Sequence, residues 1–101
     1  MSANEAAIEA EIQAKNLTAP RLNPSHIESQ IVKESYHVFG GVMTVCCLTL
    51  KNGFMVIGDS APASPANFDA ALGKRIAREH ARDKIWALEG YVLRSQLALT
   101  K

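Results

Sequence analysis

The chain has 101 residues, of which 48% are hydrophobic and 21% are charged, the composition of an ordinary globular domain and not of a disordered tail. Eleven Lys and Arg against ten Asp and Glu leave a formal charge of +1, too balanced for a protein whose whole surface binds nucleic acid or a membrane. A domain this small buries only roughly 60 to 65% of the surface of its unfolded chain, so self-association is a common supplement to its core.

Membrane, secretion and metal-binding segments are not expected. No apolar run approaches the ~20 residues of a membrane span. The stretch MSANEAAIEAEIQAK is acidic where a secretion signal is basic and then apolar, which favours a cytoplasmic protein. Cys46 and Cys47 are adjacent and in a strand point to opposite faces, so we expect buried thiols with no disulfide, no metal ion and no cofactor.

Residues 1–23 are predicted to form an N-terminal helix and a linker. Ser2 followed three residues later by Glu5 is a capping box, which predicts a helix over residues 2–15. Its apolar stripe is narrow, so this helix is expected to pack weakly or to dock on a neighbouring subunit. Residues 17–23 read as the linker.

Residues 24–101 are predicted to form a single small α+β domain. Asn23-Pro24 is a favourable helix start, because Asn caps and Pro is tolerated at the first helical position. Apolar residues recur at helical spacing as far as Val32, which predicts a second helix that ends before Gly40-Gly41.

Residues 42–61 change to a β pattern, VMTVCCLTL and MVIGDSA on either side of KNGF. Asn-Gly between two β-rich runs predicts a hairpin with a type I′ turn and Lys51 opposite Phe54. Counting outward, Leu48 lies opposite Ile57. An isolated hairpin is marginally stable and has two open edges, and no third strand is evident. Another copy of the protein is therefore expected to cover an edge or a face.

The last third is predicted to be helical, starting at the cap Ser64. Gly90 is expected to interrupt this helix, with a short final helix or extension as far as Leu99. A stripe of apolar residues is predicted to form its core face: Phe68, Leu72, Ile76 and Trp86. The fold class is therefore α+β, with N-terminal helices, a central antiparallel β-hairpin with an Asn-Gly turn, and C-terminal helices.

A basic flank lies beside that stripe, within an arc of about 100° on the helical wheel. Its members are Lys74, Arg75, Arg78 and Arg82. Arginine offers a planar fork of donors suited to phosphate or carboxylate, and Asn67, Phe68 and Asp69 near the helix start could add backbone N–H groups. Two other interpretations stay open: a solvated helix face, on which Arg75 and Glu79 pair at i, i+4, or a protein interface.

Catalysis is not expected. GxSxG, HExxH, a P-loop and GxGxxG after a strand are all absent, and the three histidines are scattered over different elements. Gly58-Asp59-Ser60 could hold a carboxylate beside a hydroxyl, but a turn accounts for it equally well. No catalytic residue is assigned.

Three stretches of the chain resemble one known family: PSHIESQIVKESY, LTLKNGFMVIGDSA and SPANFDAALGKRIAREHARDKIWALEGYVLR. It is the small tailed-phage family named after gene product forty-nine of coliphage N-four and gene sixty-six of a Shigella phage. The resemblance implies a phage or prophage origin and a role in the host cytoplasm. The family is largely uncharacterised and supplies no catalytic residues. Ala87 stands where the family usually has proline, so the helix is expected to run further here before Gly90 ends it.

We therefore expect a non-enzymatic phage accessory protein that acts by binding. The preferred hypothesis is a homo-oligomeric anti-defence sponge for a small anionic, nucleotide-type signal. In it the basic flank takes phosphates, Phe54 or Phe68 stacks on a base and Asn67 reads a polar edge. The alternative is a protein-interaction inhibitor of a host enzyme or defence complex, as anti-CRISPR proteins are. Nucleic-acid binding is less favoured because the net charge is near zero.

Overall fold

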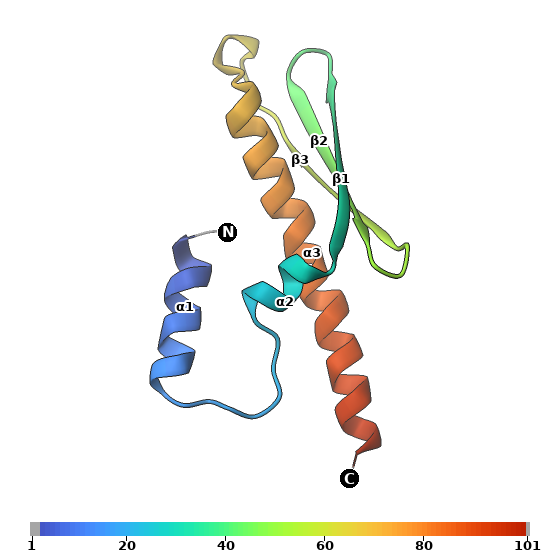
Figure 1. The fold of residues 1–101 in the computed structure, drawn as a ribbon. Helices are drawn as coiled ribbons and strands as arrows, with labels where there is room; N and C mark the ends of the chain where they lie inside the picture. The colour runs from blue at the N-terminus through green and yellow to red at the C-terminus, as the bar shows by residue number, and fades with distance from the viewer. Residues whose placement is uncertain (1–2, 101) are drawn as a thin grey trace.

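A computed structural model describes residues 3–100 of the chain (Figure 1). The strands form one antiparallel sheet in the order β1-β2-β3, and α3 crosses one face of it. The predicted α+β class with helices at both ends is confirmed. In chain order the elements are α1 (Ala3–Ala14), α2 (Pro24–Ser29), β1 (Ile31–Phe39), β2 (Met43–Leu50), β3 (Met55–Ser60), the 3₁₀ turn η1 (Pro65–Asn67) and α3 (Ala70–Leu99).

The predicted second helix is mostly a strand. Asn23 does cap a helix, because its Oδ1 accepts the N–H of His26 at 2.8 Å, but α2 ends at Ser29. The residues that follow are rich in β-branched and aromatic side chains, which favour the pleated conformation of β1. Gly40 and Gly41 then both adopt positive φ, the requirement of a type I′ turn, and lead into β2. The expectation that the chain has no third strand was wrong.

The second hairpin also differs from the prediction. Its loop spans residues 51–53, and of these only Gly53 has positive φ, so the predicted two-residue Asn-Gly turn is not formed. Leu50 donates its N–H to the carbonyl of Phe54 at 2.8 Å, the pattern of a three-residue loop that closes with a bulge at glycine. The register therefore shifts by one residue, and Leu48 lies opposite Val56. Both of these side chains are buried under α3.

The last helix is longer and starts later than the sequence indicated. Ser64 precedes η1, and the cap of α3 is Asp69, whose carboxylate accepts the N–H of Leu72 at 2.9 Å. The helix continues through Gly90 to Leu99 as one element. A helical glycine costs only about 1 kcal/mol relative to alanine. Position 87 is alanine and not proline, so the preceding turn of the helix is not broken.

The elongated shape of the molecule follows from this helix. Thirty helical residues span roughly 45 Å at 1.5 Å each. The longest extent of the molecule is 54 Å. Its radius of gyration is 16.1 Å, against about 13 Å for a compact chain of this length. The C-terminal part of α3 projects past the sheet (Figure 1), and there Tyr91 and Leu99 are exposed.

The core lies between α3 and the sheet, and its helical side is made of small residues. Ala77 and Ala81 face β3 at Gly58, where a Cβ atom would lie 2.3 Å from the carbonyl oxygen of Ala77 and 2.2 Å from the nitrogen of Ala81. Only glycine permits so close an approach of helix and strand backbones. The predicted stripe was therefore partly wrong, since Leu72 is exposed and Ala77, Ala81 and Ile85 are buried in its place.

We predict that Gly58→Ala lowers the free energy of unfolding by about 2 to 3 kcal/mol, because the added methyl group forces α3 away from β3. Gly90→Ala is the matched control: its new Cβ meets only Leu22 Cδ1 at 3.9 Å, and a helical alanine should stabilise by up to about 1 kcal/mol. Urea unfolding monitored at Trp86 measures both. Equal stability of the two variants would contradict the close helix–strand contact.

Helix α1 lies apart from the sheet, on the far side of α3 (Figure 1). Arg21 of the linker holds it, because its Nη1 and Nη2 donate to the two carboxylate oxygens of Glu9 at 2.7 and 2.8 Å. Glu5 forms a second link, to Arg82 of α3. Ser2, the predicted cap of this helix, lies outside the described residues. Ion pairs therefore link α1 both to the linker and to α3.

We predict an unusually acidic carboxyl group at Glu9. The hydrogen bonds from Arg21 first and Gln13 second lower its pKa from 4.5 to about 2. Because the folded pKa is lowered, the contribution of this pair to α1 docking is present above pH 4.5 and is lost as the pH falls toward 2. Carboxyl-detected NMR titration measures the value. In Arg21→Ala the pKa should return toward 4.5, and an unchanged value would contradict the pairing.

Candidate functional site

The predicted basic flank of α3 divides into two parts in the structure. Arg78 and Arg82 lie one turn apart and reach toward α2 and β1. Lys74 and Arg75 lie nearer the start of the helix, about a turn or two after Asn67. The two parts have different partners and therefore different chemical capacities.

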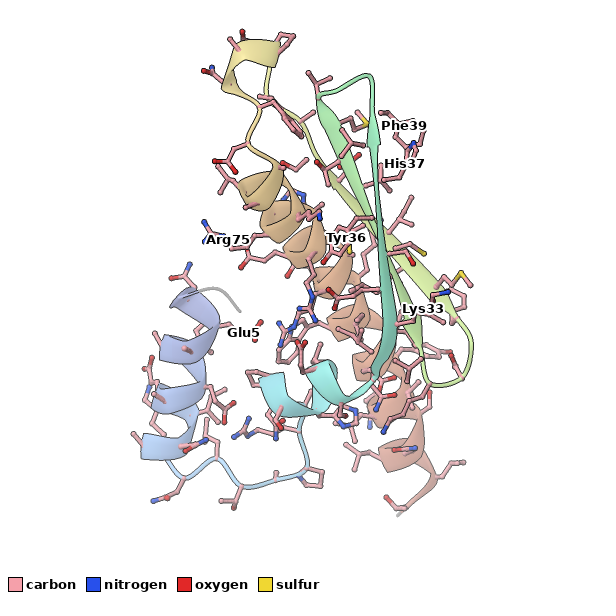
Figure 2. All side chains as sticks on the ribbon, turned by 45° about the horizontal axis from the view of Figure 1, so that its top comes forward. Glu5, Lys33, Tyr36, His37, Phe39 and Arg75 are labelled. Atoms are coloured by element: carbon pink, nitrogen blue, oxygen red, sulfur yellow. The ribbon has the colours of Figure 1, made fainter. Side chains whose placement is uncertain are left out.

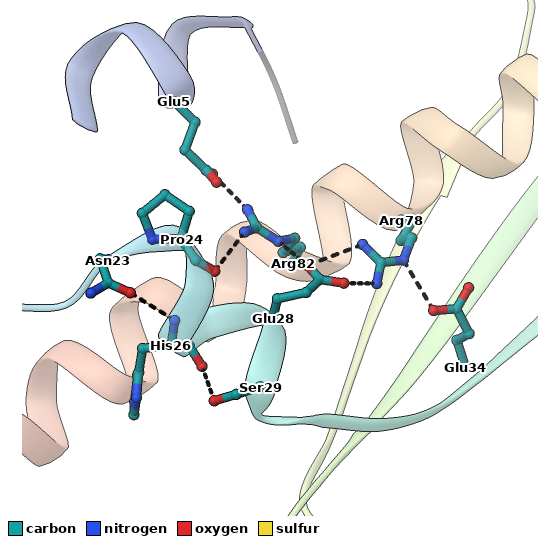
Figure 3. Close-up of polar contacts among 9 residues, drawn as sticks. All are labelled: Glu5, Asn23, Pro24, His26, Glu28, Ser29, Glu34, Arg78 and Arg82. Atoms are coloured by element: carbon teal, nitrogen blue, oxygen red, sulfur yellow. Dashed lines mark hydrogen bonds and ion pairs between the residues drawn. The ribbon is translucent and has the colours of Figure 1, made fainter. Parts of the chain in front are cut away.

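Glu28 of α2 joins the two arginines (Figure 3). Its Oε2 accepts from Arg82 Nε at 2.8 Å, and its Oε1 accepts from Arg78 Nη2. Arg82 also donates to Glu5 Oε2 at 2.6 Å and to the carbonyl oxygen of Pro24 at 3.2 Å. The Arg82 side chain is only 4% exposed, so these acceptors replace the water that it loses on folding.

The ion pairs of this network shift the pKa values of its members. The hydrogen bond from Arg78 is the main cause that lowers the pKa of Glu28, with a further contribution from Arg82. The same bond raises the pKa of Arg78, helped by a second bond from its Nε to Glu34 Oε2 at 3.1 Å. Burial alone would lower the pKa of Arg82, but its bonds to Glu5 and Glu28 outweigh burial and raise it. An external anion would have to displace these carboxylates to reach either guanidinium group.

We predict that Arg82→Ala destabilises the fold by about 3 kcal/mol, because it removes the enclosed guanidinium group that links Glu5 of α1 and Glu28 of α2 to α3. Arg75→Ala is the control from the same helix, since Arg75 is exposed, and its effect should stay within about 0.5 kcal/mol. Urea unfolding at neutral pH compares the two. An Arg82→Ala variant as stable as the control would show that the network contributes nothing to stability.

Lys74 contacts an aromatic ring on the neighbouring strand. Its Nζ lies 5.5 Å from the centroid of the Tyr36 ring, which is within the range of a cation–π contact. The Tyr36 hydroxyl donates to Glu34 Oε1 at 2.9 Å. Burial is the main cause that raises the pKa of Tyr36, so its phenol stays a neutral donor. Lys74 itself is exposed, and its ammonium group remains accessible beside this ring.

Arg75 differs from the other three members of the flank in its contacts. It is exposed, and within residues 3–100 it makes no hydrogen bond or ion pair. Figure 2 shows its side chain pointing away from the sheet. This guanidinium can therefore take up a phosphate or carboxylate without breaking an internal contact.

A small cleft lies just before this part of the flank. Its volume is about 230 Å³, and it is formed where the end of β3 and the start of α3 meet. Asn67 and the half-buried Phe68 line it, together with Val42, Leu72 and Ile76. Two of the sequence-predicted site residues therefore share one concave surface.

Phe54 is far from this cleft. It follows the 51–53 loop at the Leu50 end of β2, whereas the cleft borders Val42 at the opposite end of that strand. The length of β2 separates them by roughly 25 Å at about 3.3 Å per residue. Within one chain Phe54 cannot contact a ligand held by Phe68, so its predicted role requires a second copy.

The acidic partners of the flank were missed by the sequence reasoning. Glu28 and Glu34 were placed on one long helix, where they would not face α3, and the strand that carries Glu34 and Tyr36 was not recognised. The Gly40-Gly41 pair between two β-rich runs was the signal that could have revealed it, because Gly-Gly suits a tight hairpin turn as well as Asn-Gly does.

Comparison with known proteins gives the origin of this fold. Residues 22–97 match the sequence model of the phage protein (N4 Gp49/phage Sf6 gene 66) family. The chain belongs to this family. The match covers every element from α2 to Leu97 of α3, two residues before that helix ends, while α1 lies before it. No curated protein and no solved structure matches the chain.

The family description specifies a phage protein and no reaction. No helix within residues 3–100 is long and apolar enough to cross a membrane. In the same part of the chain no three His, Cys, Asp or Glu side chains gather as a metal ion would require. The candidate functional site of this family member combines the cleft with Asn67 and Phe68 and the exposed Lys74 and Arg75 in the first two turns of α3.

Proposed function

We propose that this protein is a phage accessory protein that acts by binding, without catalysis, in the cytoplasm of the infected bacterium. As a homo-oligomer it would sequester a small anionic, nucleotide-type signal of a host defence. Membership of a phage protein family supports the setting. The observation that carries the ligand class is a cleft lined by an aromatic ring and an amide at the start of α3, the helix on which the exposed Arg75 makes no hydrogen bond or ion pair within residues 3–100.

Each part of a nucleotide has a matching group here. Phe68 offers a face on which a base stacks, and the Asn67 amide can both donate to and accept from the base edge. Lys74 and Arg75 supply the positive charge for phosphate. The Asp69 carboxylate already accepts a hydrogen bond from the N–H of Leu72 at the start of α3. Phosphate recognition therefore depends on side chains more than on the helix terminus.

The size of the cleft supports an oligomeric sponge. Pockets that enclose a small-molecule ligand usually measure about 300 to 1,000 Å³, and this one has about 230 Å³. It can hold a base or a phosphate but leaves the rest of a nucleotide in solvent. A second copy would cover that part, and through it Phe54 could stack on the ligand.

Isothermal titration calorimetry against a panel of cyclic and linear nucleotides tests this function. We predict that one member binds and that Arg75→Ala weakens its binding by at least about tenfold, the effect of about 1.4 kcal/mol from one charge-assisted contact. Arg94→Ala, an exposed arginine on the same helix, is the matched control and should leave the affinity unchanged. Absence of heat with every nucleotide would end the proposal.

The second candidate function is a protein-interaction inhibitor. The exposed apolar side chains of Tyr91, Val92 and Leu99 on the projecting end of α3 favour it, because such a surface suits a protein partner more than a small anion. A stoichiometric host protein recovered from a bacterial lysate by the wild-type chain and lost with Tyr91→Ala would support this alternative. A sponge for a small ligand should recover none.

A further inference from the structure

The sheet has one face that no part of the described chain covers. Side chains alternate along a strand, so residues next to those buried under α3 point to the opposite side, the outer face. Figure 2 shows this alternation on β1, where Tyr36 points toward α3 and His37 and Phe39 point away from it. Six side chains of the outer face are apolar, and polar residues flank them at the two edges. The apolar ones are Phe39, Met43, Val45, Cys47, Met55 and Ile57.

The apolar side chains of the outer face are more exposed than those of a sheet face that packs in a hydrophobic core. Met55 is 60% exposed, Ile57 is 53% exposed and Phe39 is 54% exposed. The helices α2 and α3 lie on the other side of the sheet, and within residues 3–100 no loop crosses to this one (Figure 1). A contiguous apolar face of this kind marks an interaction surface.

We propose that a second copy of this chain packs on the outer face, with the two sheets face to face and the two-fold axis along β2. Two sheets packed in this way lie about 10 Å apart and interdigitate their side chains. The isologous contact would place the apolar centre of one sheet, Val45 and Cys47, against the same residues of the other. The proposal concerns an interface separate from the contact that would cover the ligand in the proposed function, and it does not depend on any ligand.

The polar residues of the outer face select this axis. His37, Val45 and Asp59 are aligned across the sheet, so His37 on β1 and Asp59 on β3 lie at the same level on opposite edges. A two-fold axis parallel to β2 leaves the position of each residue along the strand direction unchanged and brings β1 of one copy over β3 of the other. Each His37 then meets Asp59 of the second copy, and the imidazole and carboxylate form a hydrogen bond across the interface.

The other face-to-face arrangement is less favourable. An axis across the strands would place β1 over β1 and reverse the levels, so that His37 approaches Lys33 of the second copy. Asp59 would then lie over Met55 at the other edge, in the level that Lys33, Thr49 and Met55 share. A carboxylate that loses water against an apolar side chain carries a substantial desolvation penalty.

Oligomeric mass tests the assignment of the face. We expect the ligand-free wild-type chain to have twice the mass of one copy in sedimentation equilibrium. Ile57→Lys should raise the dimer Kd by at least about 30-fold, the effect of losing an interface hot spot. Ile8→Lys is the matched control, because Ile8 is 58% exposed but lies on α1, and its Kd should stay near the wild-type value. Circular dichroism verifies that both variants fold.

A monomeric wild-type chain, or a dimer that tolerates Ile57→Lys as well as Ile8→Lys, would overturn the assignment. The second result would indicate association through a strand edge or through α3. The nucleotide titration is a separate measurement with Arg75→Ala, so failure of the sponge function and failure of this interface can be told apart.

Charge exchange tests the axis. His37→Asp alone should weaken the dimer, because it places two carboxylates opposite each other at both symmetric positions. Asp59→Lys alone should also weaken it, because it places an ammonium group opposite the imidazole and removes the carboxylate acceptor. The double variant places a carboxylate opposite an ammonium group again and should recover most of the wild-type Kd. If the loss of dimerisation free energy in the double variant equals the sum of the losses in the two single variants, the axis along β2 is wrong.

Discussion

Helix α3 and strand β3 touch through their backbones at Gly58, and the positions of most other elements follow from that contact. There is no room for a Cβ atom at this position, and the helix residues that face it are the small Ala77 and Ala81, one turn apart. Such small residues bring the helix axis close to the sheet. The longer side chains next to them, Arg78 and Arg82, are thereby placed beside the layer of α2 and β1 and not out in solvent.

The ion network of Glu28, Arg78 and Arg82 is a consequence of this geometry. A guanidinium as enclosed as that of Arg82 requires acceptors, and it finds them on two separate elements, at Glu5 of α1 and at Pro24 and Glu28 of α2. Replacing such a network by apolar residues need not weaken a protein, but removing one partner leaves a desolvated charge, so these residues define one arrangement of the helices. Glu5 lies outside the family match, which begins at residue 22, whereas Pro24 and Glu28 lie inside it.

The two proposed surfaces lie on opposite sides of the sheet. The cleft with Asn67 and Phe68 and the exposed Arg75 belong to the side on which α3 lies, while the outer face is turned away from that helix. A dimer formed through the outer face would leave the cleft of each copy open to ligand. Self-association and sequestration are therefore compatible on one molecule, and additional copies would be needed to bring Phe54 to a cleft.

The sequence determined features that depend on neighbouring residues: the α+β class, the Asn23 cap, the hairpin formed by β2 and β3, and the family. Each of these follows from a short pattern whose energy is local, such as a cap hydrogen bond or a run of β-branched residues. The sequence also placed four cations on one side of a helix. It did not determine which of them carry a free charge.

Tertiary structure decided the rest, for reasons that no local pattern contains. Ile31 and Val32 fit a helix or a strand equally well, and pairing with β2 selected the strand. A bulge at Gly53 shifted the register by one residue. Arg78 and Arg82 became structural because folding brought Glu28, which is 50 and 54 positions away in the chain, within hydrogen-bond distance of both. Glu34, 44 positions away, also reaches Arg78, whereas Arg75 meets no such partner within residues 3–100 and is exposed to solvent.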